Sequence, residues 1–337
     1  MALAYKLIYS VGIFFVMMVP GIVMRKCRLS TDGFGKALSN LVLYIGQPAL
    51  VLRSYLRAFD SKILLNILYV LIFALVAHGL FTLFAMLSFR HSPDRVRRML
   101  RFSTIFANAA FMGMPLIESV LGAEYLIYAS IYNLVFNAWQ WTVGVYICTS
   151  RRDVDGDGVD DGEMLRRNDG ISLKKVLLHP VMISAYVGLV CFFFSLDPGT
   201  DYTALPVYSR FAVEILDALK GLVAPLSMVV LGLRIADIDF RGFFKEKDMY
   251  ICLILRHALL PVLVFFSMRA LMIFVEIPYG VVMTVLIMAS APVATSATMF
   301  AEMYDCDAAY VSKVVVLSTV LAIVTIPLVA MRPLIPV

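Results

Sequence analysis

Charged residues are scarce in this chain. Only 16% of its 337 residues are Asp, Glu, Lys or Arg, whereas 61% are hydrophobic and the mean hydropathy is +0.87. A soluble globular domain carries about 25% charged residues, so the composition excludes that class and indicates an integral membrane protein. The net charge is +5, but the basic residues stand between apolar runs rather than along one stripe. We therefore expect the lipid bilayer as a partner and no nucleic acid.

Cysteine and histidine are also rare. The five cysteines are scattered without close spacing, which excludes a disulfide framework and a zinc site. The four histidines show no spacing that would supply a base or a metal ligand set inside the apolar runs. We therefore expect no enzyme, no metal and no cofactor. The first apolar run lacks a small-residue cleavage site, so we expect it to remain as a membrane span.

Apolar runs long enough to cross a bilayer recur along the whole chain. A hydrocarbon core about 30 Å thick needs roughly 20 residues per helix. The runs predict ten transmembrane helices, near residues 3–24, 35–56, 63–89, 100–118, 125–148, 174–196, 207–234, 249–275, 279–301 and 308–331. Loops one, three, five and seven hold most of the Lys and Arg, whereas the second loop and the acidic ninth run against this trend. The positive-inside rule then predicts that both termini face away from the cytoplasm. We expect the protein to lie in the plasma or inner membrane.

The two halves of the chain resemble each other weakly. Residues 1–148 form a predicted first five-helix repeat, residues 149–173 a cytoplasmic linker, and residues 174–337 a second repeat that enters the membrane the other way up. Pro48 in the second span corresponds to Pro225 in the seventh. The predicted fold class is therefore all-α, with ten transmembrane helices in two inverted five-helix repeats.

The fourth and ninth spans are both predicted to be interrupted. Laying Asn108 over Ser290 sets "NAAFMGMPLIESVLGAEY" beside "SAPVATSATMFAEMYDCD", and we expect Gly113, Pro115 and Pro292 to make the breaks. A broken helix beside a cavity exposes backbone N–H and C=O groups, and its half-helix N-terminus carries partial positive charge. Two broken helices in matching positions of inverted halves indicate a transporter.

Five stretches carry a resemblance to a known family. They are "NLVLYIGQPALVLRS", "FANAAFMGMPLIESVLG", "APLSMVVLGLRIA", "APVATSATMFAEMY" and "STVLAIVTIPLV". The sequence resembles the auxin efflux carrier family, which includes microbial permeases for small organic anions. The resemblance implies that helices 4 and 9 are broken and cross each other, and that a transport domain moves in an elevator-like manner against a scaffold domain.

The chain departs from the plant members of that family at two places. Plant members have a Pro-Asn pair at the fourth-helix crossing, where this chain has Ala107 and Asn108; Pro292 matches their ninth-helix proline. A charged pair in their third helix has no counterpart in "LYVLIFALVAHGLFTLF". The resemblance therefore does not predict auxin itself as the substrate.

These features together predict a secondary-type permease or efflux carrier for a small organic anion, with a carboxylate as the favoured class. One alternative is a sodium-coupled organic anion symporter of the bile-acid symporter type. It would need acidic and hydroxyl ligands near the crossing, whereas the nearest acids, Glu118 and Glu302, lie at segment ends. A transporter-fold ligand sensor without transport is a second alternative, and a homodimer is left open.

Polar residues and prolines within the spans are the candidate site residues. The candidate substrate-binding residues are Asn108, Gly113, Asn133, Ser290, Pro292, Thr295 and Gln47, and the candidate helix-breaking residues are Pro48, Pro115, Pro225 and Pro292. Asn133 matches a substrate-facing position of the family, whereas Asn137 is expected to bond a neighbouring helix. We expect His78 to be a bonded interior histidine. For Arg256 we favour a side chain that extends to the membrane interface, with a counter-charge or titrating group, together with His257, as the alternative.

An acidic stretch, "DVDGDGVDDGEM" at residues 153–164, resembles the start of a calcium-binding loop. Asp153, Asp155, Asp157 and Gly158 occupy positions 1, 3, 5 and 6, but the twelfth position is Met164 rather than a bidentate acid. A solvated acidic linker is therefore favoured, with calcium binding left open.

Overall fold

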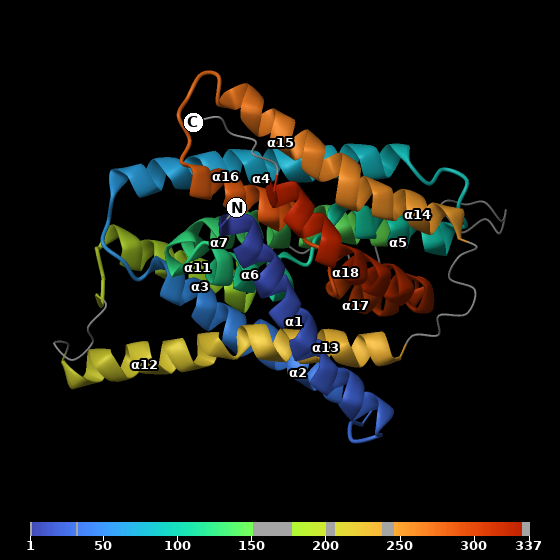
Figure 1. The fold of residues 1–337 in the computed structure, drawn as a ribbon, viewed down its shortest axis with the longest axis horizontal. Helices are drawn as coiled ribbons and strands as arrows, with labels where there is room; N and C mark the ends of the chain where they lie inside the picture. The colour runs from blue at the N-terminus through green and yellow to red at the C-terminus, as the bar shows by residue number, and fades with distance from the viewer. Residues whose placement is uncertain (1, 32, 151–176, 200–205, 238–245, 332–337) are drawn as a thin grey trace.

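The part of the chain that the structure describes is almost entirely helical (Figure 1). The computed structural model describes residues 2–31, 33–150, 177–199, 206–237 and 246–331, and these residues form helices and one isolated β-bridge. Within the described residues, five helical stretches are long and apolar enough to cross a membrane, namely Tyr5–Lys26, Ser61–Leu87, Val207–Ala236, Lys247–Leu271 and Ala308–Leu328. Shorter apolar helices cover Ala109–Val120, Pro180–Phe193 and Tyr279–Ser290. The prediction of an all-helical protein is confirmed for these residues, whereas the acidic stretch at 153–164 lies outside them.

One set of helices, which we call the framework group, is connected through α3 and α13. Its members are α1 (Ala2–Lys26), α2 (Phe34–Leu41), α3 (Gln47–Tyr55), α11 (Pro180–Phe193), α12 (Val207–Gly221) and α13 (Val223–Ala236). Helix α1 packs along α13, and α3 packs against α11 and α12. A Cβ atom on Gly21 would lie 2.2 Å from the carbonyl oxygen of Val229, and one on Gly232 would lie 2.0 Å from that of Met18. Only glycine at both positions allows α1 and α13 to approach this closely.

The remaining helices form a second set, which we call the crossing group. Its members are α4 (Ser61–Leu87), α5 (Asp94–Ile105), α6 (Met114–Val120), the short 3₁₀ helix η3 (Ala123–Tyr125), α7 (Leu126–Trp139), α8 (Val145–Thr149), α14 (Lys247–Ile254), α15 (Leu260–Leu271), α16 (Tyr279–Ser290), α17 (Ser296–Met303) and α18 (Ala308–Met331). Helix α4 contacts α5, α7 and α15, and α18 contacts α16 and α17. In Figure 1, α4 and α15 run along one edge of the molecule and α12 and α13 along the opposite edge.

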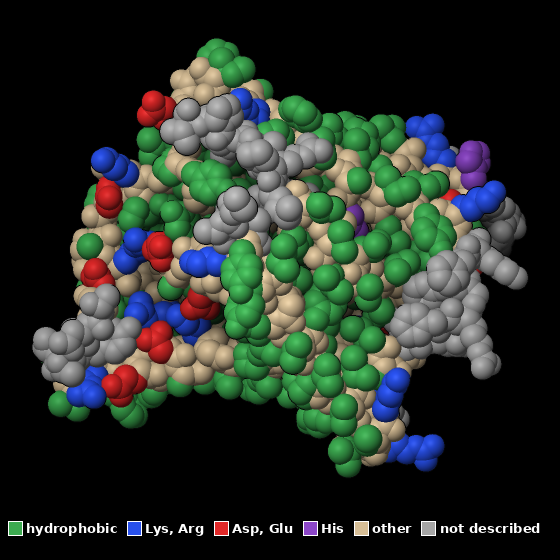
Figure 2. Space-filling model, viewed as in Figure 1, with side chains coloured by type: hydrophobic (Ala, Val, Ile, Leu, Met, Phe, Trp, Pro, Cys, Tyr) green, Lys and Arg blue, Asp and Glu red, His purple; other side chains and the backbone are tan. Residues whose placement is uncertain are grey.

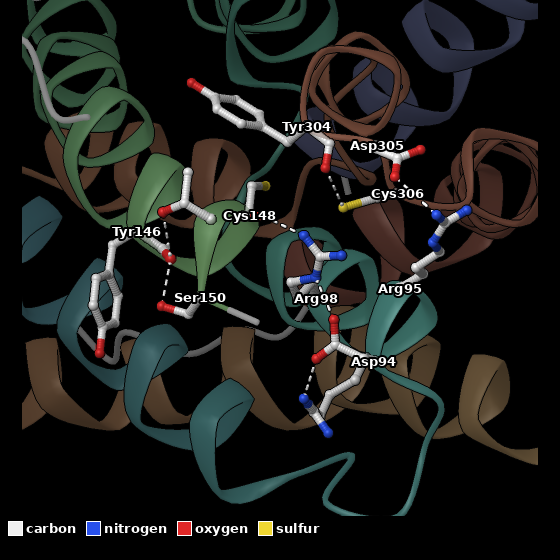
Figure 3. Close-up of polar contacts among 11 residues, drawn as sticks. Asp94, Arg95, Arg98, Tyr146, Cys148, Ser150, Tyr304, Asp305 and Cys306 are labelled. Atoms are coloured by element: carbon white, nitrogen blue, oxygen red, sulfur yellow. Dashed lines mark hydrogen bonds and ion pairs between the residues drawn. The ribbon is translucent and has the colours of Figure 1, made fainter. Parts of the chain in front are cut away.

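Polar contacts at one end tie three elements of the crossing group together (Figure 3). The buried Arg98 donates a hydrogen bond to the carbonyl oxygen of Cys148 in α8 and pairs with Asp94 at 2.8 Å. Arg95 pairs with Asp305, in the turn between α17 and α18, at 2.8 Å. These contacts join α5, α8 and the α17–α18 turn at this end of the crossing group.

Three prolines each follow a π-helical turn. The turns are η1 (Val42–Gly46), η2 (Ala109–Gly113) and η7 (Leu255–Leu259), and the prolines are Pro48, Pro115 and Pro261. A proline lacks an N–H group, and its ring clashes with the carbonyl group four residues earlier, which here is the centre of each turn. The wider π turn accommodates that clash without ending the helix.

The helix interruptions agree with the sequence predictions only in part. The prediction that Gly113 and Pro115 break the fourth span is wrong, because helix continues through both and the break lies at residues 106–108. Pro48 likewise follows a π turn without a break. Pro225 does follow an interruption, at Leu222 between α12 and α13, and Pro292 stands inside the break between α16 and α17, as predicted.

The surface is apolar across its middle. Figure 2 shows hydrophobic side chains covering the central part of one face, with Lys, Arg, Asp and Glu gathered mostly toward the two ends. Large apolar side chains are exposed along α1, α4 and α11, including Tyr5, Leu83 and Phe193. Such an exposed apolar surface suits contact with lipid chains, which agrees with a membrane-embedded protein.

Candidate functional site

The two interrupted segments, residues 106–108 and 291–295, meet through their backbones. The N–H of Asn108 donates to the carbonyl oxygen of Pro292 at 2.6 Å, and the N–H of Ala294 donates to the carbonyl oxygen of Phe106 at 2.9 Å. Between these two hydrogen bonds, Ala107 forms an antiparallel β-bridge with Val293. The predicted crossing of the two broken segments is therefore present. Its backbone groups are satisfied across the two segments, as a buried break requires.

These hydrogen bonds also give the register between the two segments. Asn108 and Ala294 occupy equivalent positions. Each directly follows the residue that forms the β-bridge in its own segment, and each donates its N–H to the carbonyl oxygen of the residue just before the bridge in the other segment. The sequence alignment placed Ser290, four positions earlier than Ala294, opposite Asn108 and is therefore wrong locally. Only the first segment carries a side-chain amide at this position, so the crossing is chemically asymmetric.

Each segment starts a new helix directly after the crossing. The π turn η2 begins at Ala109 and α17 begins at Ser296. Ala291, just before Pro292, has φ −58° and ψ 149°, the extended backbone that a following proline favours. Helix N-termini carry unpaired N–H groups and partial positive charge. Two such termini therefore lie close together at the crossing.

A cavity of about 720 Å³ lies between the framework group and the crossing group. Framework residues on its wall include Ser39, Asn40, Gln47 and Arg234. Crossing residues on its wall include Asn108, Ala110, Phe111, Asn137, Gln140, Thr295 and Ser296. Both helix N-termini of the crossing thus contribute residues to the cavity.

Several buried polar atoms on the cavity wall have no hydrogen-bond partner among the described residues. They are Nδ2 of Asn108, Nε2 of Gln47, and the Oγ atoms of Ser30 and Ser296. Asn108 is 2% exposed and Gln47 is 1% exposed. A buried polar group without a partner costs about 1–3 kcal/mol, so a polar ligand or water in the cavity would stabilise these groups.

The predicted site residues separate into two sets. Asn108, Gln47 and Thr295 line the cavity, whereas Gly113, Asn133, Ser290 and Pro292 do not. A Cβ on Gly113 would lie 2.8 Å from the sulfur of Met288, so this glycine allows η2 to pack on α16. Pro292 contributes its carbonyl group to the crossing. Asn133 and Ser290 are buried, and their side-chain polar atoms have no partner in the described part of the chain.

Asn137 and Arg234 are two of the polar cavity residues that were not assigned to the site from the sequence. Asn137 lines the cavity and donates to the backbone oxygen of Asn133 in its own helix at 2.8 Å, so the predicted bond to a neighbouring helix is wrong. Arg234 lines the cavity from α13 and donates to Oγ1 of Thr298 in α17. The only signal for Arg234 is a single arginine within the apolar stretch "VLGLRIA".

Two basic side chains elsewhere in the spans test the remaining predictions. His78 is a bonded interior histidine, as predicted, with Nδ1 2.7 Å from the carbonyl oxygen of Ala74. The prediction that Arg256 extends to the membrane interface is wrong, because its side chain is completely buried and bonded to backbone carbonyls. The guanidinium of Arg256 therefore donates to carbonyl groups at helix ends inside the protein instead of to water.

Comparison with known proteins adds one result. The profile of a protein family described as membrane transport protein matches residues 7–330, which is nearly the whole chain. No curated protein matches the sequence. The matched region includes both interrupted segments and every cavity residue named above.

Proposed function

Because this chain belongs to the membrane transport protein family, the auxin efflux carrier family, we propose that it is a secondary-type transporter of a small organic anion, with carboxylates as the favoured class. It is a multi-pass membrane protein of a transporter family, not of an enzyme family. Our proposal includes ten spans in two inverted five-helix repeats of the plasma or inner membrane, with both termini away from the cytoplasm.

The observation that carries this proposal is the chemistry of the crossing. Two helix N-termini meet at the wall of one cavity with the amide Nδ2 of Asn108, which has no hydrogen-bond partner among the described residues. N–H groups at helix N-termini favour negative charge, and an amide Nδ2 donates to an oxygen acceptor. A carboxylate supplies both the charge and the acceptor oxygens.

The charged residues of the cavity support an anion in the same way. Among the described residues, four basic side chains line it, Arg25, Lys36, Arg234 and Lys313, against two acidic ones, Asp237 and Glu302. Arg25 forms an ion pair with Asp237. The excess of basic groups raises the local concentration of anions at the cavity and speeds their entry.

The position of the cavity supports transport by movement of one group against the other. Its wall is shared between the framework and crossing groups, so a shift of the crossing group would carry the site past the framework. The two groups are joined at the cavity by the hydrogen bond from Arg234 of α13 to Thr298 of α17, and away from it by the ion pair of Lys220 in α12 with Glu118 in α6 at 2.8 Å. We propose that the structure represents the state open to one side, and that exchange of these contacts accompanies an elevator-like step.

A binding experiment tests the substrate class. The purified protein would be heated with a panel of mono- and dicarboxylates, and a carboxylate that binds the native state raises the unfolding temperature in a saturable manner. The same compound should enter proteoliposomes that contain the protein and not protein-free liposomes. Stabilisation by sterols or organic cations, with no response to any anion, would contradict the proposal.

A further inference from the structure

Arg256 lies in the π turn η7 and is bonded only to backbone carbonyl oxygens among the described residues. Its Nε donates to Ala291 at 3.1 Å, and its Nη2 donates to Ala289 and Ala291 at 2.9 Å each. Its Nη1 approaches the carbonyl oxygen of Thr104 at 3.4 Å. The side chain is 0% exposed. One guanidinium therefore holds carbonyl groups from two different helices.

These carbonyl groups belong to the two helix ends that stop at the crossing. Thr104 lies in the last turn of α5, Ala289 lies in the last turn of α16, and Ala291 follows that helix. The last carbonyls of a helix have no partner within it, and they carry partial negative charge. In secondary transporters with discontinuous helices, carbonyls of this kind can coordinate a coupling cation such as Na⁺. Here the guanidinium of Arg256 donates to these carbonyl oxygens in place of such an ion.

The charge of Arg256 is not neutralised by a carboxylate among the residues that the structure describes. No salt bridge involves it there, and its guanidinium carbon lies 4.9 Å from the ring centre of Phe81, close enough for a cation–π contact. A buried charge is costly unless it is paired, and the helix ends and the aromatic ring supply only partial negative charge. A positive charge thus remains behind the crossing, where it supports an anion bound on the other side.

We propose that Arg256 is a resident cation that fills a carbonyl-lined cation site at the crossing. Two consequences follow. The anion transport proposed above, on which this part of the inference rests, requires no metal cation as a co-substrate. Removing the side chain should open a site for a small monovalent cation, because carbonyl oxygens are hard ligands that suit such ions.

The direct test uses Arg256→Ala and needs no substrate. The unfolding temperature of the purified variant is measured in choline chloride while Na⁺ or millimolar guanidinium replaces choline at constant ionic strength. We expect a saturable rise with Na⁺, guanidinium or both. Wild type and Arg269→Ala should show no such rise, because the carbonyl site is filled in both. Arg269→Ala removes an arginine from the last turn of α15, in the same helical stretch.

The absence of any cation-specific stabilisation of folded Arg256→Ala would overturn the inference. If that variant does not fold, wild type and Arg256→Lys provide the test. Both keep a positive charge at this position, so uptake of the identified anion into proteoliposomes should proceed at equal initial rates in sodium and in choline. A sodium requirement in wild type would overturn the inference while leaving anion transport established. Failure of every anion to bind would instead contradict the proposed function, and the cation titration would still be readable.

Discussion

Asn108 combines two roles that are separable by substitution. Its backbone N–H belongs to the crossing, and its side-chain Nδ2 is unpartnered at the cavity wall among the described residues. A substitution of the side chain leaves the backbone bond in place. We therefore expect Asn108→Asp and Asn108→Ala to preserve the fold and to change anion binding.

Asn108→Asp should weaken anion binding more than Asn108→Ala. The alanine variant loses one hydrogen bond to a charged group, which costs about 1.5–3 kcal/mol or roughly ten- to hundred-fold in affinity. The aspartate variant also places a negative charge beside the anion in a site of low dielectric constant. Titrating the identified anion against thermal stability gives both dissociation constants.

Asn66→Asp is the matched control for this pair. Asn66 lies on α4, away from the cavity wall, and donates to the hydroxyl of Tyr128 at 3.3 Å. The same chemical change there should leave the dissociation constant unaltered. Equal affinity of wild type and well-folded Asn108→Asp would show that Asn108 only holds helices together.

The sequence identified part of the site because a polar residue is conspicuous in an apolar run. Gln47, Asn108 and Thr295 were found in this way, and all three line the cavity. Arg256 was placed wrongly, because the position of a residue along its own helix does not reveal which other helices end beside it. The carbonyls that bind it belong to residues 33 to 152 positions away along the chain.

At the scale of elements, the apolar runs predicted where the helices lie, whereas the positions of prolines predicted the interruptions less well. Apolar run length gave the helical segments, since a bilayer demands that length. Pro115 was read as a break, but a π turn can absorb a proline without ending the helix. The break at residues 106–108 depends instead on backbone pairing with residues 292–294, and that pairing is invisible to local propensity.

Substitution of Gly21 tests whether close contact between α1 and α13 stabilises the framework group. Because its Cβ position lies 2.2 Å from a backbone oxygen of α13, Gly21→Ala must push α1 and α13 apart. Overpacking of this kind costs about 1–3 kcal/mol, so the unfolding temperature should fall. Fluorescence-detected thermal unfolding of the detergent-solubilised protein gives the measurement.

Gly12→Ala is the control on the same helix. No atom lies within 4 Å of the Cβ position of Gly12, so alanine there should be neutral or slightly stabilising through its helix propensity. If both variants unfolded at the wild-type temperature, α1 and α13 would not be in close contact in the membrane.

At the scale of the whole molecule, the ten-span topology predicts which loops share a side. Single cysteines would be introduced by His91→Cys, Asp160→Cys and Thr200→Cys after the five native cysteines are replaced. The basic residues of the third and fifth loops place the cysteines at positions 91 and 160 in the cytoplasm, and the cysteine at position 200 then lies outside. An impermeant thiol reagent added to intact cells should therefore label only the cysteine at position 200. Identical labelling at positions 160 and 200 would contradict the ten-span topology.

Movement of the crossing group against the framework group is the last consequence of the architecture, and one contact makes it testable. Oγ of Ser10 in α1 lies 2.7 Å from Oγ of Ser119, so two cysteines at these positions can form a disulfide of about 2.05 Å. The bond would join the groups through α1 and α6, away from the charged cavity residues Arg25, Lys36 and Lys313. Oxidation should therefore stop anion uptake into proteoliposomes, and a reductant should restore it.

Anion binding should survive the oxidation, because the cavity stays open on its own side. The unfolding temperature of the oxidised Ser10→Cys/Ser119→Cys protein should still rise with the identified anion, whereas transport is lost. Each single cysteine variant, oxidised in parallel, controls for damage by the oxidant. Full uptake by protein that is demonstrably cross-linked would mean that α1 and α6 keep their contact throughout transport. The moving boundary would then have to lie elsewhere than between the two groups.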